Sequence, residues 1–125
     1  MKQGFVKVAS ATPRIRVADP VYNAQVICEQ AKEAAEHGAK IVVFPELCIT
    51  GYTCNDLFLQ ELLLEKAKEA LLTIAEETGQ LETLFLVGLP VDKDGRLYNV
   101  AAVLYRGRIL GICLLYTSPS PRDRG

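Results

Sequence analysis

The chain has 125 residues, the length of a single domain at about 100–200 residues per domain. Hydrophobic residues make up 50% and charged residues 23%, a composition that excludes an intrinsically disordered chain. The net charge is -1 without a basic block, no apolar run approaches the roughly 20 residues of a membrane span, and the amino terminus lacks the order of a signal peptide. We therefore expect a cytoplasmic protein without nucleic-acid or membrane partners.

The amino-terminal residues predict a strand followed by a helix. Phe5–Ala9 alternates weakly between apolar and polar residues and favours a strand. Asp19 suits an N-cap and Pro20 the first helical position. The helix is expected to run to about His37, with Gly38 as its left-handed stop. The stripe expected to face the core at helical spacing is Ala24, Ile27, Ala31, Ala34 and Ala35.

Ile41–Phe44 is a β-branched and aromatic run without polar alternation. Such a run predicts a strand covered on both faces, so Phe5–Phe44 is expected to form a βαβ unit. Pro45 cannot donate to a sheet ladder, which places Glu46 just past the carboxyl end of the strand. Active sites of open α/β folds lie at that edge of the sheet, although a solvated loop is also compatible with a Pro-Glu pair.

A second helix is predicted over Leu57–Thr78, ending at Gly79, and a third strand over Leu84–Leu89, closed by Pro90. The polar face of this helix, which includes Glu65 and Lys68, is interpreted as solvated surface. Its buried stripe is predicted to be Leu59, Leu63, Ala67, Ala70, Leu71, Ile74 and Thr78.

After this third strand the pattern changes to hairpins. The turn residues of Asp92–Gly95 lead into a strand over Leu97–Tyr105, and Arg106-Gly107 joins it to a strand over Arg108–Ile112. The predicted order is βαβαβββ. It favours a mixed α/β sheet with helices on one face and a second sheet packed on the other.

Cys113–Gly125 has no hydrophobic period and is rich in Pro, Ser and Arg. A disordered tail or linker is one interpretation. A second is that CLLYTSPSPRD is the translation of a transposon-end adapter used for sequencing libraries. On that hypothesis residues 1–112 are the natural domain and residues 113–125 are a non-native tail.

FPEL followed by TGY resembles the sequence around the general-base glutamate of the carbon–nitrogen hydrolase (nitrilase) superfamily. The longer strings FPELCITGYTCNDLF and GFVKVASATPRIRVADPVYN resemble the amino-terminal glutaminase domains of glutamine-dependent NAD synthetases. The resemblance covers Met1 to about Ile112, and it is specific because proline, glutamate, glycine and tyrosine match in order. It implies a four-layer αββα sandwich, of which this chain forms a part.

Amide hydrolysis in this superfamily resembles thiol acyl transfer: a cysteine attacks the carboxamide, a glutamate takes the proton, and a lysine supports the oxyanion. The resemblance implies that Glu46 is the catalytic base and that Tyr52 is a substrate-binding residue at the glutamine pocket. Asn99 matches a recurrent family position that we interpret as structural. The family's lysine position falls at Leu115 and its cysteine beyond this chain, so the 125 residues by themselves are predicted to be inactive.

The resemblance implies glutamine as substrate and a carboxyl-terminal synthetase domain, outside this chain, as partner. That domain binds ATP and Mg²⁺ and amidates deamido-NAD with the ammonia released. The sequence contains no phosphate loop of the form GxxxxGK[ST], so no cofactor is expected in residues 1–125 themselves. The intact protein is expected to be a homo-oligomer.

The spacing of the cysteines fits neither a two-pair zinc site nor a Cys-x-x-Cys motif, so no metal site is expected. Cys28 and Cys48 are predicted to be buried. Cys54 is close to Glu46 in sequence, but it is not expected to be the nucleophile because hydrolase cysteines usually lie far from their base along the chain. His37 is interpreted as a favourable charge at a helix carboxyl end.

Three functions are compatible with these patterns. The chain is part of a glutaminase domain, part of a free-standing amidase or nitrilase, or a non-catalytic flavodoxin-like binding module. A synthetase domain in the same protein separates the first from the second. The paired strands after Asp94-Gly95 count against the third, because a doubly wound fold would continue with helices.

Overall fold

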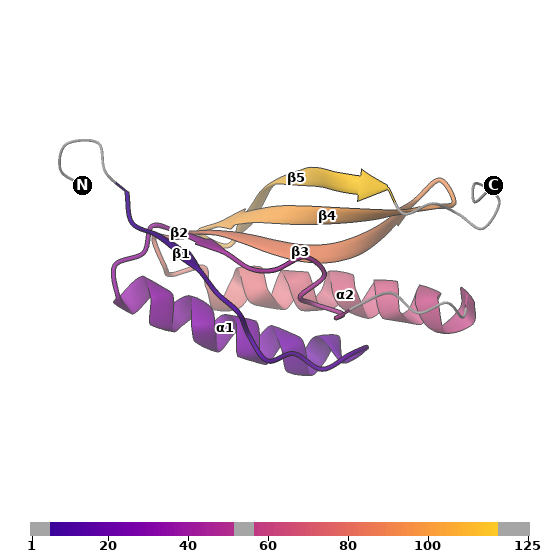
Figure 1. Ribbon diagram of the computed structural model, residues 1–125, viewed down its shortest axis with the longest axis horizontal. Helices are drawn as coiled ribbons and strands as arrows, with labels where there is room; N and C mark the ends of the chain where they lie inside the picture. The colour runs from indigo at the N-terminus through magenta and orange to yellow at the C-terminus, as the bar shows by residue number, and fades with distance from the viewer. Residues whose placement is uncertain (1–5, 52–56, 118–125) are drawn as a thin grey trace.

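The computed structural model describes residues 6–51 and 57–117. The chain alternates strands and helices and then continues with strands alone (Figure 1). The predicted βαβαβββ order is confirmed. Its elements are β1 (Val8–Ser10), α1 (Pro20–Glu36), β2 (Ile41–Val43), α2 (Leu57–Glu77), β3 (Leu84–Lys93), β4 (Arg96–Tyr105) and β5 (Arg108–Thr117).

The strands form one mixed sheet in the order β1-β2-β3-β4-β5. The first two pairs are parallel, as the βα crossovers require, and the last two are antiparallel hairpin pairs. β2 pairs with β3 only over Ile41–Val43, whereas β3 and β4 pair along nearly their whole length. The carboxyl end of β2 therefore lies beside the amino-terminal third of a much longer strand.

Helix α1 begins and ends as the sequence predicts. The side chain of Asp19 accepts a hydrogen bond from the backbone N–H of Tyr22 at 3.2 Å, and Pro20 occupies the first helical position. After His37 the chain leaves the helix at Gly38, whose φ is +88°. Of the predicted stripe, Ala24, Ile27 and Ala31 are buried and Ala34 and Ala35 are half-buried.

Helix α2 buries the predicted stripe over its described side chains Leu63, Ala67, Ala70, Leu71 and Ile74, and Thr78, just after the helix, is also buried. Leu59 lies where no side chain is described. Glu65 and Lys68 are exposed, which confirms them as solvated surface. Among the helices that the structure describes, none has the length and apolar character to cross a membrane.

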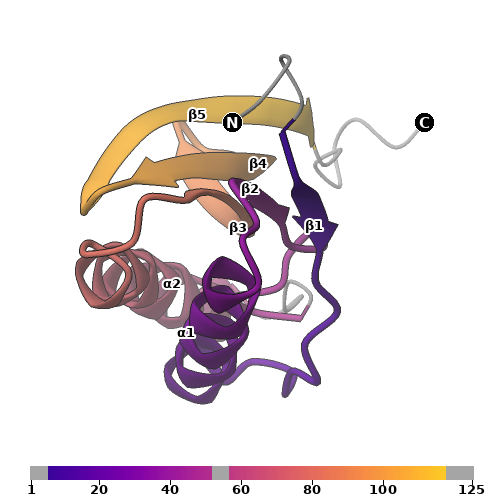
Figure 2. The same cartoon turned by 90° about the vertical axis from the view of Figure 1, so that its left-hand side faces the viewer.

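Both helices lie on the same face of the sheet (Figures 1 and 2). Val42, Phe85 and Val87 point toward the helices and are 0–1% exposed. By alternation, Val43 points to the other face and is 39% exposed. The prediction that the β2 segment is covered on both faces is therefore not met within the described residues, because Val43 stays exposed on the face opposite the helices.

The sequence predicted that the third strand is closed by Pro90. This prediction is wrong, because β3 continues through Pro90 to Lys93. Pro90 pairs with Asn99 of β4, and at this point β2 no longer runs beside β3. A proline, which lacks an N–H, is tolerated where a strand has a partner on one side only. The hairpin turn at Asp94-Gly95 is confirmed, with φ of 54° and 75°.

Strand β5 extends past Ile112 to Thr117. Cys113 pairs with Ala101 and Leu114 with Val100. The interpretation that a disordered tail starts at Cys113 is therefore wrong for residues 113–117, because these residues continue the pairing of β5 with β4. The foreign origin of residues 113–125 stays a prediction.

Candidate active site

A tight turn carries Glu46 away from the end of β2. The N–H of Phe44 still donates to the carbonyl of Leu86 at 2.9 Å, after which residues 46–50 form a turn. Leu47 adopts a positive φ of 53°, and its carbonyl accepts from the N–H of Gly51 at 2.7 Å. This closed turn fixes the backbone on both sides of Glu46.

The turn rests directly on the backbone of β3 at Gly88. A Cβ at this position would lie 2.6 Å from the nitrogen of Leu47 and 2.8 Å from the carbonyl oxygen of Pro45. These distances are shorter than any real Cβ contact, so only glycine permits the approach. The N–H of Ile49 donates to the carbonyl of Gly88 at 3.2 Å and fastens the turn to the strand.

A second segment, residues 12–19, supports the far side of the turn. Asn23 of α1 is completely buried and joins the two segments. Its Nδ2 donates to the carbonyls of Arg16 and Ile49, both at 2.7 Å, and its Oδ1 accepts from the N–H of Arg16 at 2.6 Å. The N–H of Ala18 also donates to the carbonyl of Thr50 at 2.8 Å. Helix α1 thus holds the turn in place through a satisfied polar network.

The carboxylate of Glu46 lies toward the sheet face that the helices leave open. Gly88 and Asn99 share that face, because the helix-facing residues of their strands alternate with them. The Nδ2 of Asn99 donates to Oε2 of Glu46 at 3.3 Å. Asn99 is 2% exposed, whereas Glu46 is exposed. One oxygen of the carboxylate is thus fixed while the residue stays accessible to a reactant.

An accessible carboxylate at the carboxyl end of a parallel strand is able to accept a proton from a group placed above it. The described residues contain no group of three or more His, Cys, Asp or Glu side chains placed to hold a metal ion. The geometry of Glu46 thus suits proton transfer, and its catalytic role stays a prediction.

Cys48 follows Glu46 by two residues but belongs to the core. Its thiol is 1% exposed and contacts the carbonyl of Gly88 at 3.6 Å. Burial raises the pKa of the Cys48 thiol to about 12. Burial and the nearby Glu77 likewise raise the pKa of Cys28 to about 11. Both thiols stay protonated near neutral pH, which disfavours either as a nucleophile.

The other predicted site residues lie elsewhere. Tyr52 and Cys54 fall outside the described residues. Leu115 is exposed on β5. The ring Nδ1 of His37 lies 2.8 Å from the carbonyl of Glu33. The backbone carbonyl of His37 accepts a hydrogen bond from the ammonium of Lys7 at 2.6 Å. His37 therefore makes its contacts at the carboxyl end of α1. Of the residues named from the sequence, the structure brings together Glu46 and Asn99.

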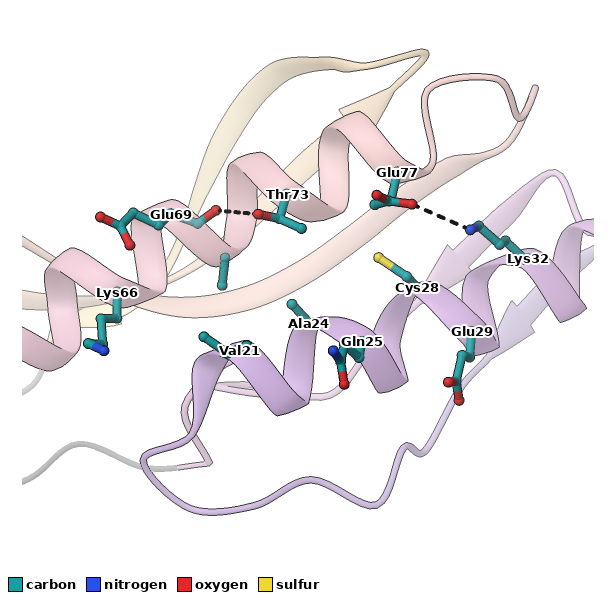
Figure 3. Close-up of a pocket in the computed structure, with 11 residues that line it drawn as sticks. Val21, Ala24, Gln25, Cys28, Glu29, Lys32, Lys66, Glu69, Thr73 and Glu77 are labelled. Carbon is teal, nitrogen blue, oxygen red and sulfur yellow. Dashed lines mark hydrogen bonds and ion pairs between the residues drawn. The ribbon is translucent and has the colours of Figure 1, made fainter.

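A groove of about 660 Å³ lies between α1 and α2, away from this site (Figure 3). Ala24, Cys28 and Ala70 are among its lining residues, and Lys32 and Glu77 form an ion pair at 3.6 Å across it. Both members of that pair are half exposed, so it contributes little stability. Glu46 is not among the residues that line this groove.

Comparison with known proteins gives one consistent relationship. Residues 7–115 match the family described as Carbon-nitrogen hydrolase. The glutamine-dependent NAD(+) synthetase of Mycobacterium tuberculosis is 38% identical over 122 residues, which are 98% of this chain and 18% of that protein. The chain thus spans less than a fifth of the length of the curated relatives that it matches first.

Two solved structures show the same arrangement of elements. A glutamine-dependent NAD(+) synthetase from Cytophaga hutchinsonii superposes with a TM-score of 0.77 at 31% identity, covering 86% of this chain and 18% of that one. An amidase from Nesterenkonia sp. superposes with a TM-score of 0.75 at 22% identity, covering 99% of this chain and 48% of that one. The second likeness shows the nitrilase-type fold alone. Since the family match spans most of its residues, this chain belongs to the carbon–nitrogen hydrolase family.

Proposed function

We propose that this chain forms part of the glutaminase domain of a glutamine-dependent NAD synthetase. Its identity to the synthetase of Mycobacterium tuberculosis is 38% over 98% of the chain, whereas its identity to the amidase is 22%. In the proposed reaction the carboxamide of glutamine is hydrolysed, and the ammonia serves the ATP-dependent amidation of deamido-NAD.

The observation that supports this function best is the seating of Glu46 above Gly88 and beside Asn99. The proposed role of Glu46 is to accept the proton of a cysteine thiol as that thiol attacks the carboxamide. Glu46 then gives this proton to the departing ammonia, and the restored carboxylate takes a proton from the water that attacks the acyl-enzyme. That second proton returns to the cysteine thiolate as glutamate leaves. The exposure of Glu46 leaves room for both reactants, and the turn keeps its backbone fixed between the two steps.

The remaining parts of the proposed enzyme lie outside the described residues. They are the nucleophilic cysteine, the lysine that supports the oxyanion, and a synthetase domain that takes ATP and Mg²⁺. Tyr52 is proposed to line the glutamine pocket. We further propose a homo-oligomer that acts in the cytoplasm, where its small polar substrates are dissolved.

A free-standing amidase is the second candidate, because the amidase fold covers 99% of this chain. The two candidates differ in the fate of ammonia. A synthetase couples its release to the amidation of deamido-NAD, whereas a free-standing amidase releases it to solvent.

The test is Glu46→Gln in a full-length NAD synthetase whose glutaminase domain carries this sequence. The substitution keeps the shape and removes the base, so glutamine-dependent NAD synthesis should fall by about 10²–10⁴-fold. Synthesis from added ammonia should survive, because that reaction bypasses amide hydrolysis. Both rates are measured as NAD formed from deamido-NAD and ATP.

Glu65→Gln is the matched control, since Glu65 is an exposed carboxylate on the polar face of α2. It should leave both rates unchanged. A loss of both rates in Glu46→Gln would make Glu46 a structural residue, and an unchanged glutamine-dependent rate would remove it from the reaction.

A further inference from the structure

Two asparagines are buried among the described residues, and they use their amide groups differently. Asn23 is 0% exposed, and both ends of its amide bond to backbone atoms at 2.6–2.7 Å. Asn99 is 2% exposed, and among the described residues its Nδ2 bonds only to the carboxylate of Glu46. Its Oδ1 is buried without a partner in the described part of the chain.

An unpaired buried polar atom is unfavourable, so the side chain of Asn99 weakens the fold more than an apolar side chain of its size would. An asparagine kept for structure alone would satisfy both ends of its amide, as Asn23 does. Pro90 lies across the ladder from Asn99 and has no N–H to offer its Oδ1. The one described hydrogen bond of the Asn99 side chain is therefore to the carboxylate of Glu46, and the side chain makes no described hydrogen bond that stabilises β4 itself.

The bond also joins distant parts of the chain. Glu46 lies on a turn after β2, and Asn99 lies 53 residues later on β4, with β3 between these strands. The backbone of Glu46 is fixed by its seat on Gly88, but this seat leaves the side-chain torsions of an exposed glutamate free. A donor on β4, which is paired with a strand on each side, restricts that freedom.

We propose that Asn99 is a positioning residue for the reaction: it holds Oε2 of Glu46 so that Oε1 faces the group whose proton is taken. The unpaired Oδ1 of Asn99 keeps the amide in this orientation if it accepts a donor from the remainder of the active site. This inference rests on the proposed function of Glu46 as base, and it adds a second residue through which that base acts.

The test is a double-mutant cycle in the full-length enzyme, with Asn99→Leu in the native and in the Glu46→Gln backgrounds. Asn99→Leu should lower the glutaminase kcat by about 10–100-fold, as for a misplaced catalytic group, and leave the KM for glutamine unchanged. In the Glu46→Gln background it should cause no further fall, because a residue that acts through Glu46 has no separate contribution. Synthesis from added ammonia should be retained in every variant.

Asn99→Asp is the second variant, because it keeps the size and polarity of the side chain while replacing the donor by a carboxylate. Its kcat should fall at least as far as that of Asn99→Leu. Thr83→Val is the stability control: Thr83 is 3% exposed, and its Oγ1 donates to the carbonyl of Ala39 at 2.9 Å before β3, at the opposite end of the sheet from Glu46. It should lower the melting temperature and leave kcat unchanged.

The outcomes separate the two proposals. If Glu46→Gln has no effect on the glutaminase rate, the proposed function of Glu46 fails. If Glu46→Gln abolishes that rate but Asn99→Leu or Asn99→Asp keeps the native kcat, the positioning role alone is overturned. An equal fall in both backgrounds, or an equal loss of ammonia-dependent synthesis, would also overturn it and make Asn99 a structural residue.

Discussion

At the scale of single residues, burial separates the carboxylate from the thiols around it. Glu46 and Cys48 are two residues apart on one turn, yet Glu46 is exposed and Cys48 is 1% exposed. The turn at Leu47 sends the two side chains in different directions. A reactant therefore meets the carboxylate and not the thiol next to it in sequence.

The raised pKa of Cys48 predicts how stability depends on pH. The unfolded thiol loses its proton near pH 9.0, but the folded thiol keeps it until about pH 12. Between these values the unfolded state binds fewer protons, so the free energy of unfolding falls as pH rises. The expected slope is at most about 1.4 kcal/mol per pH unit for this group. Urea unfolding at a series of pH values above 9.0 measures it.

Cys48→Ala should reduce this slope, although Cys28 keeps a part of it through its own raised pKa. Cys113 is the exposed control for thiol accessibility. In the folded protein at neutral pH, iodoacetamide should label Cys113 and spare Cys48. Rapid labelling of Cys48 would contradict its assignment to the core.

At the scale of elements, β3 supports the site. It pairs in parallel with β2 on one side and antiparallel with β4 on the other. Gly88, near its middle, seats the turn that carries Glu46, and its partner strand β4 brings Asn99 to the same carboxylate. The site thus depends on one glycine in a strand whose other central residues are large and apolar.

Gly88→Ala should displace the turn, because the added Cβ would meet backbone atoms of Pro45 and Leu47. Backbone cannot move aside as a flexible side chain does, so the expected loss of stability is about 1–3 kcal/mol, typical of overpacking. Glutaminase activity of the full-length enzyme should fall with it, since Glu46 moves with the turn. Thermal unfolding and ammonia release from glutamine measure the two effects.

Gly111→Ala on β5 is the matched control, because a Cβ there would meet nothing within 4 Å. It should be neutral or slightly stabilising. Equal effects of the two substitutions would show that glycine flexibility, and not the close approach at Gly88, governs this part of the sheet.

At the scale of the whole molecule, one face of the sheet is packed and the other is open. The helices bury Val42, Phe85 and Val87, while Val8 and Val43 on the opposite face are 58% and 39% exposed. The edge strand β5 adds exposed Ile109, Leu110, Ile112 and Leu114. Apolar faces and free strand edges of this kind favour association.

We expect residues 1–125, produced by themselves, to oligomerise or to be poorly soluble. Light scattering during size-exclusion chromatography measures the size of the particles. Val8→Lys places a charge on the open face at an exposed position and should reduce the association. A monodisperse monomer that melts cooperatively would contradict this prediction.

We also expect these 125 residues by themselves to release no ammonia from glutamine. Acyl transfer needs a thiolate beside the base, and Cys48, the cysteine nearest to Glu46 in the described sequence, is buried and protonated. Members of a catalytic set act as a unit, so a base alone gives little rate. The assay is ammonia release from glutamine, with Cys54→Ser as control. Turnover that disappears in Cys54→Ser would make Cys54 the nucleophile.

The sequence by itself determined the order of elements and most of their bounds. Asp19, Pro20 and Gly38 carry their own backbone preferences, so the limits of α1 follow from local chemistry. The buried stripe of α2 and the turn at Asp94-Gly95 follow from period and turn propensity in the same way. The motif around Glu46 also identified the family from residue order alone.

Only the tertiary structure decided which groups meet. Pro90 continues its strand because β2 has already ended beside it, a fact about neighbours that no local pattern contains. Position 88 must be glycine because the backbone of Pro45 and Leu47, which follow β2, packs against it. Asn99 bonds to Glu46, from which it is separated by 53 residues in sequence. Propensity and period act over a few residues, whereas these contacts depend on the register of three strands.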